Sequence, residues 1–279
     1  MQAIVEPQWV KEHLESLVII DCRFHLNDPL KGRQEYSNEH IPQAFYFDLD
    51  QDLSGTIEKH GGRHPLPDLN KLRDKLEAVG VSNDVTVVLY DDQNSAMASR
   101  LWWLLSYLGH DKTYILNGGF KEWKRQGYPV STSPSIPIKK GTFIPVVQQN
   151  MVVSAHDILR DLKAFELRES YLIDSREPKR YLGLEEPIDK KAGHIPGAYN
   201  YFWMDNLTAN RWRNEEELKQ QFAELDPSKE IIVYCGSGVT ACPNVLALKE
   251  AGFTNVKLYP GSWSDWISYE ENPISTSSR

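Results

Sequence analysis

The chain contains 279 residues, and at roughly 100–200 residues per domain that length favours two domains. Hydrophobic residues make up 41% and charged residues 25%, which is enough apolar material for real cores and excludes a wholly disordered chain. The net charge is −8, whereas proteins that bind phosphate backbones are usually basic, so nucleic acid is not expected as a partner. No apolar run approaches the roughly 18 residues of a membrane helix, so a membrane partner is not expected either.

Predicted strands and helices alternate along both halves of the chain. In the first half, an apolar strand within residues 17–23 precedes a helix at 69–79, a strand at 85–90 and a helix at 96–108. In the second half, a strand within 171–176 precedes a helix at 215–225, a strand at 231–234 and a helix at 241–250. This alternation predicts an α/β fold with mainly parallel sheets flanked by helices.

The two halves also share motifs in the same order, about 150 residues apart. Asp21-Cys22-Arg23 corresponds to Asp174-Ser175-Arg176, and His40-Ile-Pro corresponds to His194-Ile-Pro. We therefore expect a duplication, with a first domain at residues 1–127 and a second at 151–279. Residues 128–150 begin with a stretch rich in Pro, Ser and Thr that does not favour a helix, so they are predicted to form a linker.

The clearest chemical signal begins at Cys235, directly after the predicted strand at 231–234. Ligands of parallel α/β sheets bind beyond the carboxyl ends of the strands, where Cys235 is expected to lie. Gly236 and Gly238 allow a tight loop whose backbone N–H groups point inward, and the next helix adds its positive N-terminal end. Such a site favours the thiolate, the nucleophilic form of cysteine. The corresponding residue of the first half is Asp91, which has no nucleophilic sulfur, so catalysis is expected in the second half alone.

Taken together, these motifs show that the chain resembles the tandem rhodanese family of sulfurtransferases over nearly its whole length. The resemblance is carried by the loop at 235–240 and by residues 36–44, 193–198 and 259–266. Gln43 departs from the usual glycine, and Lys190 stands where an aromatic residue is typical. The resemblance implies two rhodanese-like domains, the first inactive and the second active through a persulfide on Cys235. It also implies that the donor contacts the remaining loop residues, which are Gly236, Ser237, Gly238, Val239 and Thr240.

The resemblance leaves the sulfur donor open. The loop Cys-Gly-Ser-Gly-Val-Thr resembles that of 3-mercaptopyruvate sulfurtransferases, whereas thiosulfate-specific members usually carry basic residues at its second and third positions. The mercaptopyruvate group implies a catalytic proton-transfer chain of Ser237, His64 and Asp50. Arg180 matches an arginine that holds the anionic donor, but a second arginine of that group is absent because Ile188 occupies its place.

We therefore expect sulfur transfer from 3-mercaptopyruvate, slightly preferred, or thiosulfate to cyanide or a thiol acceptor such as thioredoxin. The alternatives are thiosulfate:cyanide sulfur transfer as the main activity and a sulfur carrier without turnover. A cysteine phosphatase or arsenate reductase is disfavoured, because Ala241 replaces the arginine of a Cys-x5-Arg loop. No cofactor or metal is expected, since the histidines and cysteines lack metal-ligand spacing. Three scattered cysteines and no recognisable secretory signal favour the cytoplasm.

Overall fold

The structure, a computed structural model, describes residues 3–137 and 139–276 and divides into two compact units. The units differ from the predicted domain boundaries in three segments. Residues 56–65 pack with the second unit, whereas residues 209–212 and the predicted linker as far as residue 148 pack with the first. The second unit otherwise consists of residues 149–208 and 213–276. The segment 56–65 matters for function, because it brings residues from the first half of the sequence into the second unit.

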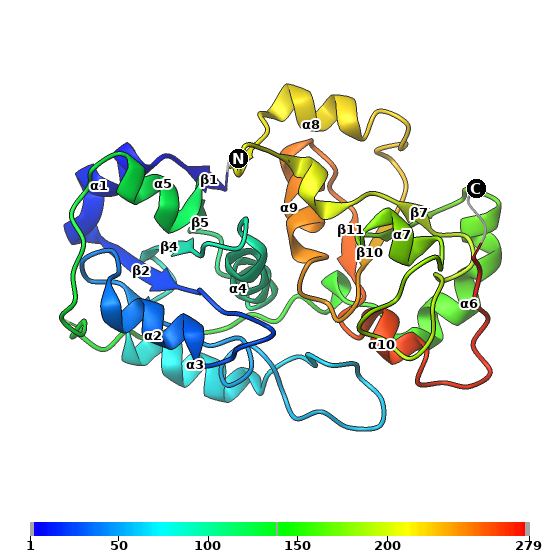
Figure 1. Cartoon of the computed structure of the whole chain (residues 1–279), viewed down its shortest axis with the longest axis horizontal. Coiled ribbons are helices and arrows are strands. Elements are labelled where there is room, and N and C mark those ends of the chain that lie inside the picture. Colours follow the sequence, from blue (N-terminus) through cyan, green and yellow to red (C-terminus); the bar gives the residue numbers. More distant parts are fainter. Residues whose placement is uncertain (1–2, 138, 277–279) are drawn as a thin grey trace. The chain divides into compact units, whose positions relative to one another are not determined.

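The first unit is built on a parallel sheet with the strand order β1-β5-β4-β2-β3. The strands are β1 (Ile4–Val5), β2 (Leu17–Asp21), β3 (Phe45–Tyr46), β4 (Thr86–Tyr90) and β5 (Thr113–Leu116), and the short β9 (Arg211–Trp212) also belongs to this unit. The helices are α1 (Pro7–His13), η1 (Leu14–Ser16), α2 (Lys31–Asn38), α3 (Leu69–Ala78), α4 (Ala96–Tyr107) and α5 (Gly119–Arg125). Figure 1 shows α1 and α5 on one side of this sheet and α2 and α3 on the other.

The second unit contains a parallel sheet with the strand order β11-β10-β6-β7. The strands are β6 (Tyr171–Asp174), β7 (Tyr199–Asn200), β10 (Ile231–Tyr234) and β11 (Val256–Leu258), with the short β8 (Leu207–Thr208) outside the sheet. The helices are η2 (Gln149–Met151), α6 (Ala155–Glu166), α7 (Pro178–Tyr181), η3 (Trp203–Asn206), α8 (Glu215–Gln221), α9 (Cys242–Glu250) and α10 (Ser262–Trp266). In Figure 1 the strands β10 and β11 lie between α9 and α6. The predicted α/β fold with helix-flanked parallel sheets is confirmed.

One predicted helix is shorter than expected. Helix α8 ends at Gln221, whereas the spacing of apolar residues predicted a helix as far as residue 225. The chain leaves the helix because Phe222 and Leu225 turn into the core, where they are 0% and 5% exposed. The N–H groups of Ala223 and Leu225 donate to carbonyls three residues back, as in a tightened last turn. The other predicted helices and strands named above agree with the structure to within one residue.

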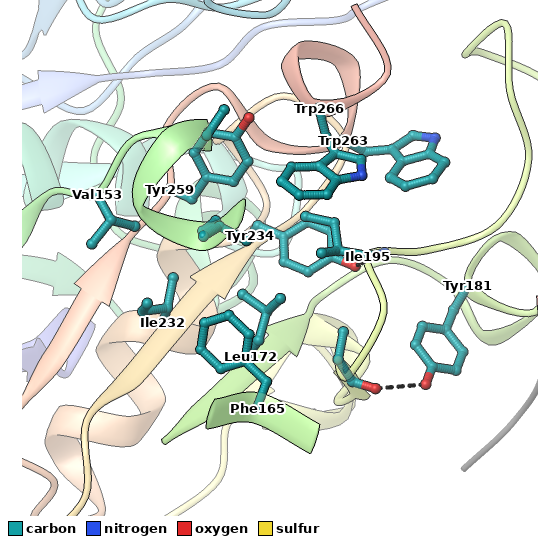
Figure 2. Close-up of a cluster of buried hydrophobic side chains, with 13 residues drawn as sticks. Val153, Phe165, Leu172, Tyr181, Ile195, Ile232, Tyr234, Tyr259, Trp263 and Trp266 are labelled. Atoms are coloured by element: carbon teal, nitrogen blue, oxygen red, sulfur yellow. Dashed lines mark hydrogen bonds between the residues drawn. The ribbon is translucent and has the colours of Figure 1, made fainter. Parts of the chain in front are cut away.

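A buried cluster of aromatic and aliphatic side chains covers one face of the second sheet (Figure 2). Trp263 and Trp266 of α10 are fully buried against Tyr234 and Ile195, and the Tyr181 hydroxyl donates to the Ala198 carbonyl at 2.7 Å. The first unit has a corresponding core that includes Trp123, Tyr90 and Ile41. Five tryptophans lie on helices in the cores of the two units, and they are residues 102, 103, 123, 263 and 266.

The repeated Asp-x-Arg motif forms the same buried ion pair in both units. Arg23 Nη2 lies 2.6 Å from Asp21 Oδ2, and Arg176 Nη2 lies 2.6 Å from Asp174 Oδ2. Each arginine also donates to the carbonyl of the residue just before the His-Ile-Pro motif. In the second unit that residue is Gly193. Because unpairing such a buried charge is costly, the pair fixes this segment against the carboxyl end of a central strand.

The predicted linker packs along the first unit as extended chain. The N–H of Gly141 donates to Glu77 O at 2.7 Å, the N–H of Gln148 donates to Tyr107 O at 2.8 Å, and Phe143 is 2% exposed.

Within residues 3–137 and 139–276, no helix is long and apolar enough to cross a membrane.

Candidate active site

Cys235 is the residue that directly follows β10, at the carboxyl end of the second sheet. Its side chain is 1% exposed, and its Sγ accepts a hydrogen bond from the Gly238 N–H at 3.2 Å. The loop at 235–241 then enters α9 with Pro243 in the first turn, where a missing N–H has no cost. The sulfur of Cys235 is therefore placed beside a backbone donor and the start of a helix, as predicted from the glycines.

The closing motif at residues 259–266 holds this loop in place. Ser262 Oγ accepts from the Cys235 N–H at 3.1 Å and donates to the Tyr259 carbonyl at 2.9 Å. The N–H groups of Trp263 and Ser264 donate to the carbonyls of Cys235 and Gly236, both at 2.9 Å. Ser262 has a φ of +55°, a conformation that costs a non-glycine residue energy and is retained where surrounding contacts fix it. Here those contacts fix the backbone of Cys235.

The corresponding loop of the first unit shows what this backbone is built to hold. Asp91 follows β4 as Cys235 follows β10, and it is 1% exposed. Its carboxylate accepts from four backbone N–H groups at 2.8–2.9 Å, which are those of Gln93, Ser95, Met97 and Ala98. Burial raises the pKa of Asp91, and these four hydrogen bonds oppose the increase. Both loops therefore place an acidic group against N–H donors, with a carboxylate in one and a thiol in the other.

The structure brings Ser237 and His64 together within the second unit. Ser237 Oγ lies 2.7 Å from His64 Nδ1, and the two residues are 7% and 8% exposed. His64 reaches the loop because residues 56–65 are held along α10. The N–H of Gly61 donates to Asp265 Oδ1 at 2.7 Å, and the N–H of Arg63 donates to Ser264 Oγ at 3.1 Å.

Asp50 belongs to the first unit, in the turn after β3. Its N–H donates to Asp48 Oδ1 at 3.0 Å. Burial, followed by the negative charge of Asp48, raises the pKa of Asp50. The predicted link between Asp50 and His64 stays a prediction, because the two residues belong to different units.

Two arginines lie beside the loop, although only Arg180 was predicted. A Cβ added at Gly236 would lie 3.0 Å from Arg63 Nη2 and 3.6 Å from Arg180 Nη2. Burial lowers the pKa of Arg63, and negative charge on Cys235 opposes the decrease. Sequence reasoning missed Arg63, and the available signal was its place directly before His64. The guanidinium of Arg63 thus occupies the space that a basic side chain at position 236 would fill.

Two buried carboxylates organise these arginines. Glu186 accepts from Arg180 Nη2 at 2.8 Å and from Arg176 Nη1 at 3.2 Å, and its side chain is 4% exposed. Asp189 is also 4% exposed and accepts from Arg180 Nη2 at 3.0 Å, while its other oxygen pairs with Arg63. Both acids come from the segment between α7 and His194, which was not predicted to contribute to the site.

That segment also explains the unusual Lys190. In the first unit, Tyr36 stacks on His40 with ring centroids 4.1 Å apart and donates to Ala44 O at 2.8 Å. In the second unit, Tyr181 makes both contacts, stacking on His194 at 3.8 Å and donating to Ala198 O at 2.7 Å. The aromatic residue is therefore present, but at a larger sequence separation from its histidine. Both histidines also contact the carbonyl of their tyrosine at 2.6 Å, which supports a structural role.

The remaining loop residues connect Cys235 to α9. Gly236, Gly238 and Val239 are buried, and Thr240 is half-buried at the last turn before α9. Cys242 Sγ lies 3.3 Å from the Gly238 carbonyl, inside the first turn of α9. All three cysteines are buried, and none of them forms a disulfide.

Comparison with known proteins assigns the chain to a family. The profile of the rhodanese-like domain matches residues 6–126 and 154–269. A probable 3-mercaptopyruvate sulfurtransferase of Pseudomonas aeruginosa is 43% identical, covering 93% of this chain and 92% of that protein. A thiosulfate sulfurtransferase of Cricetulus griseus is 33% identical, covering 95% of this chain and 92% of that protein.

A solved structure agrees with these matches. The 3-mercaptopyruvate sulfurtransferase from Leishmania major superposes with a TM-score of 0.85 at 31% identity. The match covers 98% of this chain and 76% of that one. With two matching domains, a cysteine at the end of a parallel strand and relatives along almost its whole length, the chain belongs to the rhodanese family of sulfurtransferases.

Proposed function

We propose that this chain transfers sulfur through a persulfide on Cys235, with 3-mercaptopyruvate as the preferred donor and thiosulfate as a slower one. The observation that carries the donor preference is the 2.7 Å hydrogen bond between Ser237 Oγ and His64 Nδ1, two residues from the nucleophile. Mercaptopyruvate brings a thiol proton that must be moved, and a serine–histidine pair is suited to moving it. Thiosulfate brings no such proton.

In the first half-reaction, the Cys235 thiolate attacks the thiol sulfur of mercaptopyruvate. The new S–S bond forms while the C–S bond breaks, and the electron pair of the C–S bond remains on carbon as the enolate of pyruvate. The thiol proton passes through Ser237 and His64 to that carbon, which gives pyruvate and a Cys235 persulfide. With thiosulfate the same attack on the outer sulfur releases sulfite, and no proton is transferred.

The anionic end of the donor is proposed to bind at Arg180 and Arg63. Guanidinium groups grip carboxylates and oxyanions through paired N–H donors. Both groups lie within reach of Gly236, next to Cys235, so a donor held there presents its sulfur to the nucleophile. Arg63 supplies the second positive charge, which is missing at position 188 because Ile188 takes the place of an arginine there. Asp50 is proposed to orient His64.

In the second half-reaction, a nucleophilic acceptor attacks the outer sulfur of the persulfide and releases the Cys235 thiolate. We propose cyanide, a small thiol or a thioredoxin-like dithiol as acceptors, because each is a nucleophile that takes one sulfur atom. Such turnover needs reduced thiols, which supports a cytoplasmic site of action.

A specific observation favours thiosulfate as the second candidate. The Arg63 guanidinium fills the space at Gly236 where thiosulfate-specific members of the family would carry a basic residue. A positive charge is therefore present near the reacting sulfur even though the loop itself has none. Thiosulfate:cyanide sulfur transfer as the main activity is the resulting alternative, and sulfur carriage without turnover is the third.

The test compares the donors in the wild type and in Ser237→Ala. The kcat/KM of the wild type is expected to be higher for 3-mercaptopyruvate, and the substitution is expected to lower that value about 100-fold, the scale of one general acid–base contact. Thiosulfate turnover should fall much less. Ser268→Ala is a matched control, because Ser268 Oγ makes a 2.7 Å contact with His60 Nδ1 outside the 235–242 loop. Equal losses for both donors, or a faster wild-type reaction with thiosulfate, would refute the assignment.

A further inference from the structure

The arginines proposed to bind the donor already hold a carboxylate that belongs to the protein. Asp189 Oδ2 accepts from Arg180 Nη2 at 3.0 Å, and Asp189 Oδ1 pairs with Arg63 Nη1. The Asp189 side chain is 4% exposed, so its charge is largely removed from water. One buried carboxylate therefore bridges two guanidinium groups, which is the arrangement that a carboxylate donor requires.

The bridge lies close to the reacting cysteine. Both guanidinium groups come within 4 Å of a Cβ added at Gly236, the residue after Cys235. Arg180 is further neutralised by Glu186, whose Oε1 lies 2.8 Å from Arg180 Nη2. A donor held by these arginines therefore binds beside the negative charges of Asp189 and Glu186, in a setting where those charges are only weakly screened.

We propose that Asp189 is a specificity-determining residue, which occupies the two donor-binding arginines in the free enzyme and disfavours donors with two negative charges. The proposal rests on the function proposed above. A donor carboxylate takes over one or both guanidinium groups, while the negative charge of Asp189 remains nearby. Asp189 repels the single negative charge of a monoanionic donor end. Thiosulfate is a compact dianion, so Asp189 repels two negative charges on it.

This doubling gives a quantitative expectation. Coulomb energy is proportional to the product of the charges, so the penalty for thiosulfate is about twice that for the carboxylate of mercaptopyruvate. Removing the charge of Asp189 should therefore raise the rate constants of both donors unequally. If that for mercaptopyruvate rises about fivefold, that for thiosulfate should rise about 25-fold.

The test is Asp189→Asn, which keeps the shape of the side chain and removes its charge. The measured quantity is the second-order rate constant for persulfide formation in a single turnover, followed as pyruvate or sulfite release from each donor. Glu185→Gln is the matched control, because Glu185 lies in the same segment, is 56% exposed and pairs with Lys179 instead of the arginines. It removes the same charge and should change either constant less than twofold.

A larger gain for thiosulfate than for mercaptopyruvate supports the proposal. A loss with both donors would show that Asp189 merely positions the arginines, and equal gains would show that it does not discriminate by charge; either result overturns the proposal. If Asp189→Asn melts well below the wild type, Asp189→Ser is measured in the same way. Failure of the wild type to form a persulfide would instead refute the proposed function.

Discussion

Gly238 is the position where the geometry of the active loop can be tested most sharply. Its φ is +78°, and a Cβ added there would lie 2.1 Å from the Pro260 carbonyl oxygen. The left-handed conformation alone costs alanine about 1–2 kcal/mol. The clash is with backbone, which cannot rotate away as a side chain can, and overpacking of this kind costs about 1–3 kcal/mol more. Gly238→Ala is therefore expected to lower the free energy of unfolding by about 2–5 kcal/mol.

Gly252→Ala separates the two contributions. Gly252 also has a positive φ, +96°, but no atom of the described residues lies within 4 Å of its added Cβ. That variant should lose about 1–2 kcal/mol, from backbone strain alone. Unfolding in urea gives both values, and single-turnover persulfide formation reports whether the Gly238 N–H still supports the sulfur, which it contacts at 3.2 Å. The reasoning is refuted if Gly238→Ala is no less stable than Gly252→Ala and forms the persulfide at the wild-type rate.

Two further predictions concern the first unit. Burial raises the pKa of Asp92 to about 6, although the hydrogen bond from the Lys121 N–H opposes the increase. The folded state therefore binds the Asp92 proton more tightly than the unfolded state does. As a result, the protein loses stability as pH rises through about 6. Asp92→Asn should therefore stabilise the protein by about 3 kcal/mol at pH 7.5 and about 1 kcal/mol at pH 4.5, and equal gains in urea unfolding at the two pH values would contradict this. Asp91→Cys should form no persulfide, because the loop after it lacks the glycines of the active loop. The first unit also has Glu35 before Tyr36, at the position where the second unit has Arg180 before Tyr181. A sulfur adduct on the new thiol would contradict that expectation.

Features that depend on short stretches of sequence were predictable. Cys235, the glycine loop and the helix after it occupy one continuous segment, so strand, turn and helix preferences together placed Cys235 at the end of β10. The duplication added an internal comparison, in which Asp91 marked the unit whose corresponding loop begins with a carboxylate in place of a thiol. The Asp-x-Arg motifs that this comparison aligned form the same ion pair in both units, through Arg23 and Arg176.

Features that depend on tertiary packing were not predictable from local pattern. Arg63 lies in the first half of the sequence, and it reaches the second unit because residues 56–65 are held along α10. Apart from the neighbouring His64, nothing in the local sequence distinguishes Arg63 from a solvated arginine. The role of Tyr181 was hidden by a change in spacing, since the segment that carries Glu186 and Asp189 separates it from His194. Pairing of His64 with Ser237 was anticipated from family resemblance, because sequence spacing alone carries no information over 173 residues.

The central claim is that Cys235 carries the transferred sulfur through repeated turnovers. The most direct measurement is the intact mass of the protein after exposure to 3-mercaptopyruvate, followed by addition of a thiol acceptor and by steady-state turnover. The account predicts a gain of one sulfur atom on the wild type, its loss to the acceptor, and neither adduct nor turnover in Cys235→Ser with unchanged melting. Turnover by a folded Cys235→Ser variant, or an adduct on Cys22 or Cys242 in place of Cys235, would contradict it.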